Sequence, residues 1–334
     1  LRVNTTGVNN VALGYAALYD NTTGQENVAL GKDTLANNTT ASNNTAVGYS
    51  ALAENTTGSN NTAVGNAALG TNTTGGYNTA VGNQALRVST TAVNNVAFGH
   101  ASFYSNTTGD YNLGMGNNAL YANTTGSSNL AIGHEALTNN TTAHNNLAIG
   151  RGALLSNTTG YRNIGIGRFA GDSISTGIEN VSIGYDAGDT ITTGSNNICI
   201  GYDAEPASAT TNTSVTLGNS QINSLRCNTT SISSLSDARD KTDVEDLPAG
   251  VEFINKLRPV KFKWQRRTPD TNDGTIQAGF IAQELQEAQK DNKYLNLVLE
   301  DNPDKLEATQ GNLIPVLVKA IQELSAKVTA LEAK

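Results

Sequence analysis

The chain has 334 residues, of which 37% are hydrophobic and only 15% charged, and it is long enough for two average domains. Its net charge of −8 gives little support to nucleic-acid binding, its two cysteines exclude a disulfide scaffold, and no apolar run is long enough to span a membrane. We therefore expect no nucleic-acid partner and no membrane insertion. The chain opens on Leu1-Arg2 without Met, so we expect a piece of a longer protein.

A glycine recurs every 17 residues from Gly14 to Gly218, and this spacing defines thirteen repeats. An asparagine lies four residues before each glycine, from Asn10 to Asn197, with one exception in the last repeat. A large apolar residue precedes each glycine, and the residue before that one is usually small. This alternation of large and small residues predicts a short strand in each repeat. The unbroken period predicts a parallel β-solenoid shaft over residues 1–223.

The segments between these strands predict turns. Asn-Thr-Thr-Gly, as at residues 21–24, is turn chemistry, and a second apolar pair such as Ala17-Leu18 indicates another short strand or a bend. The asparagine row is expected to form an amide ladder from coil to coil rather than a ligand site. A 17-residue coil encloses little volume, so we expect the apolar rows, with their small members, to meet two other copies around a threefold axis.

Two neighbouring repeats carry a resemblance to a known family. The strings Asn129-Leu130-Ala131-Ile132-Gly133 and Asn146-Leu147-Ala148-Ile149-Gly150 resemble the head repeats of trimeric autotransporter adhesins. Those heads are trimeric parallel β-rolls of short coils, and the resemblance covers residues 4–220. The 17-residue spacing here is longer than the usual head repeat. The fold expected for the shaft is accordingly mainly β, a trimeric parallel β-roll or solenoid.

The composition changes after the last repeat. Residues 224–235 are rich in Ser and Thr and short of large apolar groups, which predicts a linker. Residues 236–334 hold the single Trp and most of the Pro, Lys and Glu, which predicts a small α+β domain. We expect helices at 248–257 and 282–289 and strands at 260–264 and 295–299, with residues 278–281 leading into the second helix.

The C-terminal stretch predicts a coiled-coil helix. Its apolar residues follow steps of three and four, the a/d pattern of a heptad repeat. About two and a half heptads are too few for an isolated helix to be stable, so we expect a trimeric bundle supported by the rest of the domain. The stripe consists of Ile314, Leu317, Ile321, Leu324, Val328 and Leu331.

Four blocks of this second unit resemble the endosialidase-type intramolecular chaperone domain. They are Ser236-Asp237-Ala238-Arg239-Asp240-Lys241, then Leu257-Arg258-Pro259-Val260 with Phe262 and Trp264, then Gly279-Phe280-Ile281-Ala282-Gln283-Glu284-Leu285, and Pro315 to Leu324. The family lies at the C-terminus of phage tailspikes and tail fibres. The resemblance implies a domain that trimerises, templates the folding of the upstream fibre and then cuts itself off.

The family makes its cut just before the serine of the first block, which here implies the bond Leu235–Ser236. The resemblance points to Ser236 as nucleophile and Lys241 as base, because a serine hydroxyl is a poor nucleophile until a base removes its proton. An N-to-O acyl shift and direct hydrolysis by the Ser–Lys dyad are both open. Asp237 and Arg239 either position the scissile loop or form a surface ion pair. The activity is a single self-cleavage, with no cofactor and no external substrate expected.

The remaining residues predict no metal site. His100 and His134 lie two coils apart, too far to share one metal ion. The row that follows the repeat glycines is aromatic and basic in places, and it is either plain surface or a contact for sugars. Cys199 and Cys227 are expected to be free thiols.

These features together predict a homotrimeric fibre that attaches to a host surface. Its expected place is a virion tail fibre with a cell-surface glycan or protein receptor. A bacterial surface fibre that uses the same chaperone is the alternative. A polysaccharide-degrading tailspike is disfavoured, because the shaft's acidic residues, such as Asp20, Asp33 and Asp110, are scattered and not paired as a glycosidase needs.

Overall fold

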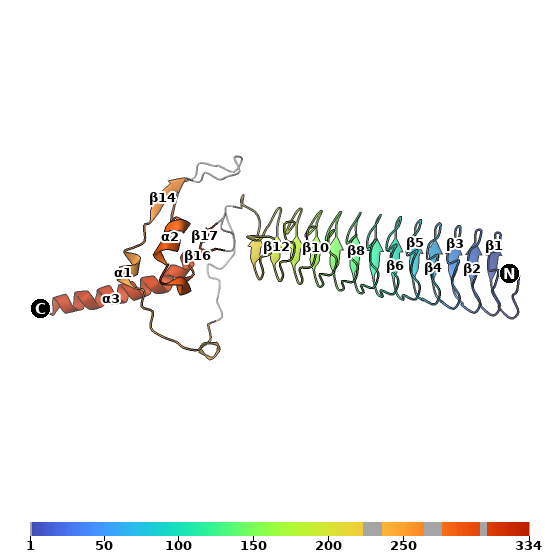
Figure 1. Cartoon of the computed structure of the whole chain (residues 1–334), viewed down its shortest axis with the longest axis horizontal. Coiled ribbons are helices and arrows are strands. Elements are labelled where there is room, and N and C mark those ends of the chain that lie inside the picture. Colours follow the sequence, from blue (N-terminus) through green and yellow to red (C-terminus); the bar gives the residue numbers. More distant parts are fainter. Residues whose placement is uncertain (1, 223–235, 264–275, 301–305, 334) are drawn as a thin grey trace. The chain divides into compact units, whose positions relative to one another are not determined.

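The computed structural model describes residues 2–222, 236–263, 276–300 and 306–333 (Figure 1). The chain divides into two compact units, Leu1–Asn219 and Ser220–Lys334. The linker predicted at 224–235, the residues Cys227 and Leu235 within it, and Trp264 lie outside the described residues.

The first unit is a parallel β-solenoid in which every repeat supplies one three-residue strand to a single thirteen-stranded sheet. Each strand pairs with the next in parallel and in register, so that Val11 lies opposite Val28 and Ala12 opposite Ala29. This confirms the solenoid predicted from the 17-residue period. The strands are β1 (Val11–Leu13), β2 (Val28–Leu30), β3 (Thr45–Val47), β4 (Thr62–Val64), β5 (Thr79–Val81), β6 (Val96–Phe98), β7 (Leu113–Met115), β8 (Leu130–Ile132), β9 (Leu147–Ile149), β10 (Ile164–Ile166), β11 (Val181–Ile183), β12 (Ile198–Ile200) and β13 (Val215–Leu217).

The repeat glycines end the strands because the chain turns there in a conformation that other residues avoid. Gly31 has φ of +134°, and a Cβ built on it would lie 2.4 Å from the carbonyl oxygen of Gly48 in the next coil. A side chain at this place would therefore strain the backbone and collide with the neighbouring coil. The glycine period in the sequence follows from this close approach between coils.

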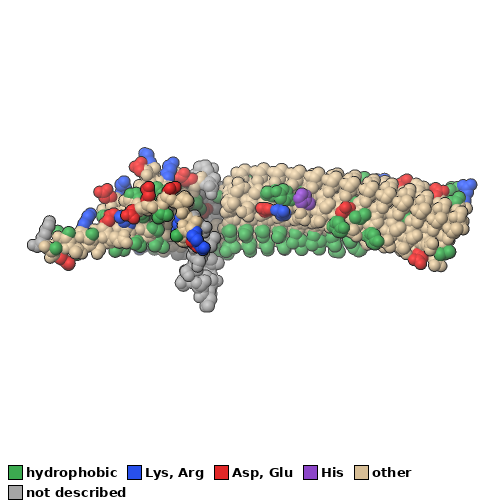
Figure 2. Space-filling view, turned by 90° about the horizontal axis from the view of Figure 1, so that it is seen from below, with side chains coloured by type: hydrophobic (Ala, Val, Ile, Leu, Met, Phe, Trp, Pro, Cys, Tyr) green, Lys and Arg blue, Asp and Glu red, His purple; other side chains and the backbone are tan. Residues whose placement is uncertain are grey.

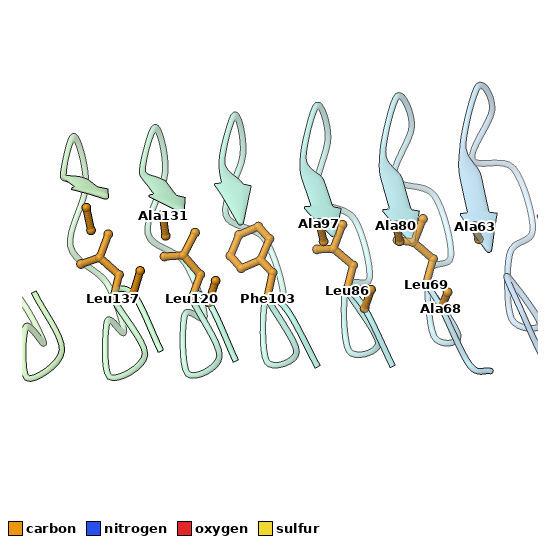
Figure 3. Close-up of a cluster of buried hydrophobic side chains, with 14 of the residues drawn as sticks. Ala63, Ala68, Leu69, Ala80, Leu86, Ala97, Phe103, Leu120, Ala131 and Leu137 are labelled. Carbon is orange, nitrogen blue, oxygen red and sulfur yellow. The ribbon is translucent and has the colours of Figure 1, made fainter. Parts of the chain in front are cut away.

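The core of the shaft lies inside each coil of the single chain. From β2 to β12 the small middle residue of the strand, such as Ala63 or Ala80, is buried in one cluster with the second apolar pair, such as Ala68-Leu69 (Figure 3). The prediction that these small residues meet other chains is therefore wrong. The second apolar pair forms a turn rather than a strand, and Leu52 adopts a left-handed φ of 51° that folds its side chain into the coil. In most coils one leucine fills the space that the alanine leaves, and Phe103 takes this place in one coil.

Two late coils fill the same core in a different way. Gly171 stands where the preceding coil has Leu154, and Ile174 stands where it has Asn157. A Cβ on Gly171 would lie 2.9 Å from Cδ1 of Ile174, so the isoleucine occupies the space of the missing leucine. The next coil repeats the exchange with Ile191. Ile174 and Ile191 are fully buried, as close packing of the interior requires.

The asparagine row forms the predicted amide ladder. Asn27 is buried; its Oδ1 accepts the backbone N–H of Asn44 at 3.1 Å, and its Nδ2 donates to the carbonyl oxygen of Ala41 at 2.9 Å. The same pattern repeats along the shaft, so that each side chain satisfies backbone groups of the neighbouring coil. The row has a structural role because it pairs buried polar groups that would otherwise be costly.

A second amide ladder comes from the asparagine of the Asn-Thr-Thr-Gly turns, which the sequence indicated only as a turn former. Asn38 Nδ2 donates to Asn21 Oδ1 at 2.8 Å, and Asn55 Nδ2 to Asn38 Oδ1 at 3.0 Å. The ladder is interrupted where Ser89 replaces asparagine. Oδ1 of Asn72 and Oγ of Ser89 are buried there with no hydrogen-bond partner in the described part of the chain.

We expect Ser89→Asn to stabilise the shaft. Most other coils hold asparagine in the same slot, and the new amide would satisfy Asn72 Oδ1 and close the gap. A satisfied buried hydrogen bond contributes about 1 kcal/mol, so the thermal midpoint of unfolding should rise. Ser105→Asn makes the same chemical change away from the ladder and serves as the control. An equal shift for both variants would contradict the assignment.

Glu205 supplies hydrogen bonds to the shaft where the chain leaves the solenoid path. In an earlier coil the backbone N–H of Ser156 donates to the carbonyl oxygen of Asp172 at 2.8 Å. At the equivalent place, two coils later, Thr190 N–H donates to the carboxylate of Glu205 at 3.2 Å, and Asp189 N–H does so at 2.8 Å. Burial raises the pKa of Glu205 to about 7; hydrogen bonds from Thr190 oppose that rise, and repulsion by Asp189 adds to it.

We expect the last coils to loosen as pH rises through about 7. The pKa of Glu205 in the folded chain lies above its ordinary value of 4.5, so the folded state holds the proton more strongly. The resulting stability is complete below pH 4.5 and is lost as pH rises through about 7. Glu205→Gln stays neutral and keeps one acceptor. Hydrogen exchange at Asp189 and Thr190 should therefore speed up in the native chain relative to this variant between pH 5 and pH 8.

Glu54→Gln, an exposed change in the middle of the shaft, is the control for this measurement. If the difference in exchange between the native chain and Glu205→Gln is the same at both pH values, then ionisation of Glu205 does not govern the last coils.

The second unit is a small α+β fold with two two-stranded antiparallel sheets, β14–β15 and β16–β17. The helix predicted at 248–257 is shorter, because the backbone of Gly250 is not helical. The strand predicted at 295–299 begins as a 3-10 turn. The elements are η1 (Ala238–Asp240), α1 (Val251–Ile254), β14 (Val260–Lys263), β15 (Ile276–Gly279), α2 (Ala282–Ala288), η3 (Lys293–Leu295), β16 (Val298–Leu299), β17 (Glu307–Ala308), η4 (Gln310–Leu313) and α3 (Ile314–Glu332).

The long helix α3 is anchored to this unit by one face. Val316 is buried in a hydrophobic cluster with Phe253 of α1 and Leu285 of α2. Ala320, one turn further along α3, is also buried. The carboxylate of Glu323 accepts the first backbone N–H of α1, that of Val251, at 2.9 Å. These contacts hold the N-terminal half of the helix on the domain. Such support is expected, because a helix of this length is not stable by itself.

Candidate functional site

The structure brings Ser236 and Lys241 into contact. Lys241 Nζ donates a hydrogen bond to Ser236 Oγ at 2.6 Å, and both side chains are exposed. The short helix η1 lies between them and returns the chain so that residues five apart meet. A serine hydroxyl within hydrogen-bond reach of an amine is the geometry that nucleophilic catalysis needs. The proposed scissile bond joins Ser236 to Leu235, which lies outside the described residues.

Asp237 and Arg239 shape the turn between the serine and the lysine. Asp237 Oδ1 accepts the backbone N–H of Arg239 at 2.9 Å and so caps η1, and the Arg239 guanidinium pairs with the same carboxylate at 2.6 Å. The side-chain hydrogen bond from Arg239 is the main cause that holds the pKa of Asp237 below its ordinary value. The pair is solvent-exposed, and it lies in the turn that separates Ser236 from Lys241.

A second exposed ion pair joins two other blocks of the family resemblance. Arg258 donates from Nε to Glu284 Oε2 at 3.0 Å and also pairs through its Nη2. These hydrogen bonds from Arg258 hold the pKa of Glu284 below its ordinary value. Leu257, Phe280 and Leu285 pack around this pair. The arrangement links the loop before β14 to α2, which gives Glu284 a structural role.

The heptad stripe of α3 is exposed in the single chain. Its members lie beside the buried face formed by Val316 and Ala320, and their exposed fractions run from 45% at Leu317 to 69% at Leu331. A helix that leaves this much apolar surface in water is typical of a helix that binds partner helices. The stripe begins where the anchored face of the same helix lies on the domain.

The shaft also carries apolar side chains on its outer surface. The first and third residues of the strands form two outer apolar rows, interrupted only by Thr45, Thr62 and Thr79 at the start of β3, β4 and β5. These rows are partly or fully exposed: Leu13 is 71% exposed, and Phe98 37%. Figure 2 shows a band of hydrophobic side chains that follows part of one face of the shaft. A contiguous apolar band is unusual on a monomeric soluble protein and marks an interaction surface.

Residues 236–294 match the family model for the chaperone of endosialidase. This part of the chain is an endosialidase-type chaperone domain. The match spans three of the four blocks that carried the resemblance, including Ser236 and Lys241, and ends before α3. No curated protein and no solved structure matches the chain in the corresponding comparisons. The chain is therefore a fibre-type protein in which a β-solenoid shaft precedes a C-terminal chaperone domain.

Other candidate chemistry is sparse in the described residues. They contain no group of three His, Cys, Asp or Glu side chains that could hold a metal ion. None of their helices is both long and apolar enough to cross a bilayer. Cys199 is a free thiol buried in the shaft, and burial raises its pKa to about 12, which makes it unreactive. The contact of Glu323 with α1 had no signal in the sequence, because it joins residues far apart in the chain.

Proposed function

We propose that this chain is a homotrimeric fibre, in first place a phage tail fibre that attaches to a host surface, whose chaperone domain templates trimer folding and then releases itself at Leu235–Ser236. The observation that carries the self-cleavage is the 2.6 Å hydrogen bond between Lys241 Nζ and Ser236 Oγ inside the matched domain. A bacterial surface fibre with the same chaperone is the alternative location.

The trimer is supported by two apolar surfaces that the single chain leaves in water. The outer apolar rows of the shaft and the heptad stripe of α3 both run along their elements without interruption by charge. Three copies in parallel would bury both surfaces, and burial of apolar area is the main favourable term in such association. The helix would then nucleate the trimer, and the shafts would be brought together in register.

The chemistry needs only groups of this chain and water. Ser236 Oγ attacks the carbonyl carbon of Leu235 while Lys241 takes the hydroxyl proton. The C–N bond breaks, the amine of Ser236 receives a proton, and an ester links the two residues. Water then hydrolyses the ester and frees residues 1–235 from residues 236–334. In the competing route the dyad activates water, which attacks the same carbonyl directly.

The exposure of the dyad in the single chain suggests how cleavage is tied to assembly. A lysine accepts a proton only as the neutral amine, and burial favours that form. Ser236 and Lys241 are both in solvent in the isolated chain. Neighbouring chains of a trimer would cover them, so the cut would follow correct folding rather than precede it.

The test is the mass of the purified protein on a denaturing gel and by mass spectrometry. We expect two species, residues 1–235 and residues 236–334, from a chain that has assembled. A single species of full length from a folded trimer would remove the self-cleavage from the proposal. Sedimentation of the same sample as a folded monomer would remove the trimer.

A further inference from the structure

The residues that follow the repeat glycines form an exposed row along the shaft, and beside strands β8 to β12 this row is basic or aromatic throughout. We call these five side chains the basic stripe; all are exposed. Because the strands are paired in register, successive members lie one coil apart, and the rings of the last two stack with centroids 5.6 Å apart. The stripe consists of His134, Arg151, Arg168, Tyr185 and Tyr202.

Stacking fixes the two arginines of the basic stripe in place. The Arg168 guanidinium lies 4.8 Å from the ring centroid of Phe169 and 5.3 Å from that of Tyr185, and its Nη1 donates to Tyr185 Oη at 3.3 Å. The Arg151 guanidinium lies 5.7 Å from the same Phe169 ring. A stacked guanidinium keeps its N–H groups in its own plane, so stacking on the faces leaves donors at the edges. These side chains lose little freedom when they bind a ligand.

The charge of these two arginines is not neutralised by the chain. Among the described residues neither Arg151 nor Arg168 takes part in an ion pair, although the chain as a whole carries a net charge of −8. Asp186, beside Tyr185, contacts Arg168 through its backbone N–H, which donates to the Arg168 carbonyl oxygen at 3.0 Å. His134 is paired with Glu135 at 3.3 Å. Three other arginines do pair with carboxylates, namely Arg162, Arg239 and Arg258.

We propose that the basic stripe binds an extended anionic polysaccharide that lies along the shaft. Two preordered guanidinium groups one coil apart, followed by two exposed tyrosine hydroxyls, fit a polymer that repeats an anionic group and hydroxyls along its axis. The planar guanidinium of arginine can form paired hydrogen bonds with either a carboxylate or a phosphate. The proposal therefore includes polysaccharides that carry either anionic group. The inference deepens the proposed attachment function and rests on it.

The experiment measures binding of the full chain to three immobilised polymers. Polygalacturonate carries carboxylates, poly(glycerol phosphate) carries phosphates, and pullulan is neutral. We expect binding to one of the two anionic polymers at low salt, weakening as salt is added, and none to pullulan. Arg151→Gln and Arg168→Gln should each lower the affinity about tenfold, the loss of one charge-assisted hydrogen-bonded contact.

Arg162→Gln is the matched control, because Arg162 lies outside the stripe and pairs with Glu179 at 2.8 Å. Equal binding to pullulan, unchanged affinity of the double variant, or no binding to either anionic polymer would overturn the inference. The proposed attachment is tested separately by binding of the fibre to bacterial cells. If Arg151→Gln and Arg168→Gln do not change cell binding, the attachment function is retained but the basic stripe is not its binding site.

Discussion

Ser236→Ala should leave the chain as one species of full length. The variant has no hydroxyl to attack the Leu235 carbonyl, and in both routes that Ser236 and Lys241 offer, the hydroxyl is required. The native chain should give residues 1–235 and residues 236–334 in equal amounts. Loss of the nucleophile should lower the cleavage rate by at least about three orders of magnitude. The readout is intact-mass spectrometry of samples incubated for increasing times.

Two controls separate self-cleavage from a contaminating protease. Ser233→Ala changes a serine that has no role in the proposal and should be cut as fast as the native chain. Lys241→Ala should block cleavage, whereas Lys256→Ala, which removes another exposed lysine of the same domain, should not. The Ser–Lys assignment fails if Ser236→Ala still yields both fragments at the native rate.

Leu324→Asp should abolish both trimer and cleavage. Leu324 is half exposed in the single chain and lies in the heptad stripe, while the buried face of α3 is held by other residues. The isolated domain should therefore tolerate the change. In a trimer the carboxylates of three chains would meet in the apolar seam, at a cost of about 3 kcal/mol or more for each uncompensated charge. Sedimentation velocity measures the association, and a denaturing gel measures the cut.

The matched control is Gln322→Asp, which adds the same charge to an exposed position outside the heptad stripe. It should assemble and cleave normally. A Leu324→Asp monomer that is cut at the native rate would show that the chemistry of Ser236 and Lys241 is local, and the link between assembly and cleavage would be lost although the dyad survives.

The repeat made most of the shaft predictable. Each strand, each turning glycine and the ladder that includes Asn27 follow from residues that recur at the same phase, because in-register stacking puts equivalent residues into equivalent environments. The interior was predicted wrongly. The alternation in β3 predicts a strand but does not tell which face of that strand lies inside the coil. The left-handed turn at Leu52, which folds a large side chain into the coil, is a conformation that leucine rarely adopts.

The second ladder escaped prediction for a different reason. Asn38 is both a turn former and a member of a chain of amides, and the first role already accounts for its type. In the chaperone domain the heptad stripe, the strand β14 and the helix α2 were predictable from local pattern, while the strand β17 and the pairing of Glu323 with α1 were not. The contact between Ser236 and Lys241 could be predicted only from the family resemblance, because a serine and a lysine five residues apart carry no signal by themselves.

The in-register stacking of the shaft restricts how its length can vary. Because the strands and the asparagine ladders pair residues that are 17 apart, inserting or removing one residue would displace all later rows against the earlier ones. Adding or removing 17 residues would keep every row continuous. A change of length that keeps these rows continuous therefore comes in whole coils. The length of the shaft is therefore set by the number of its repeats.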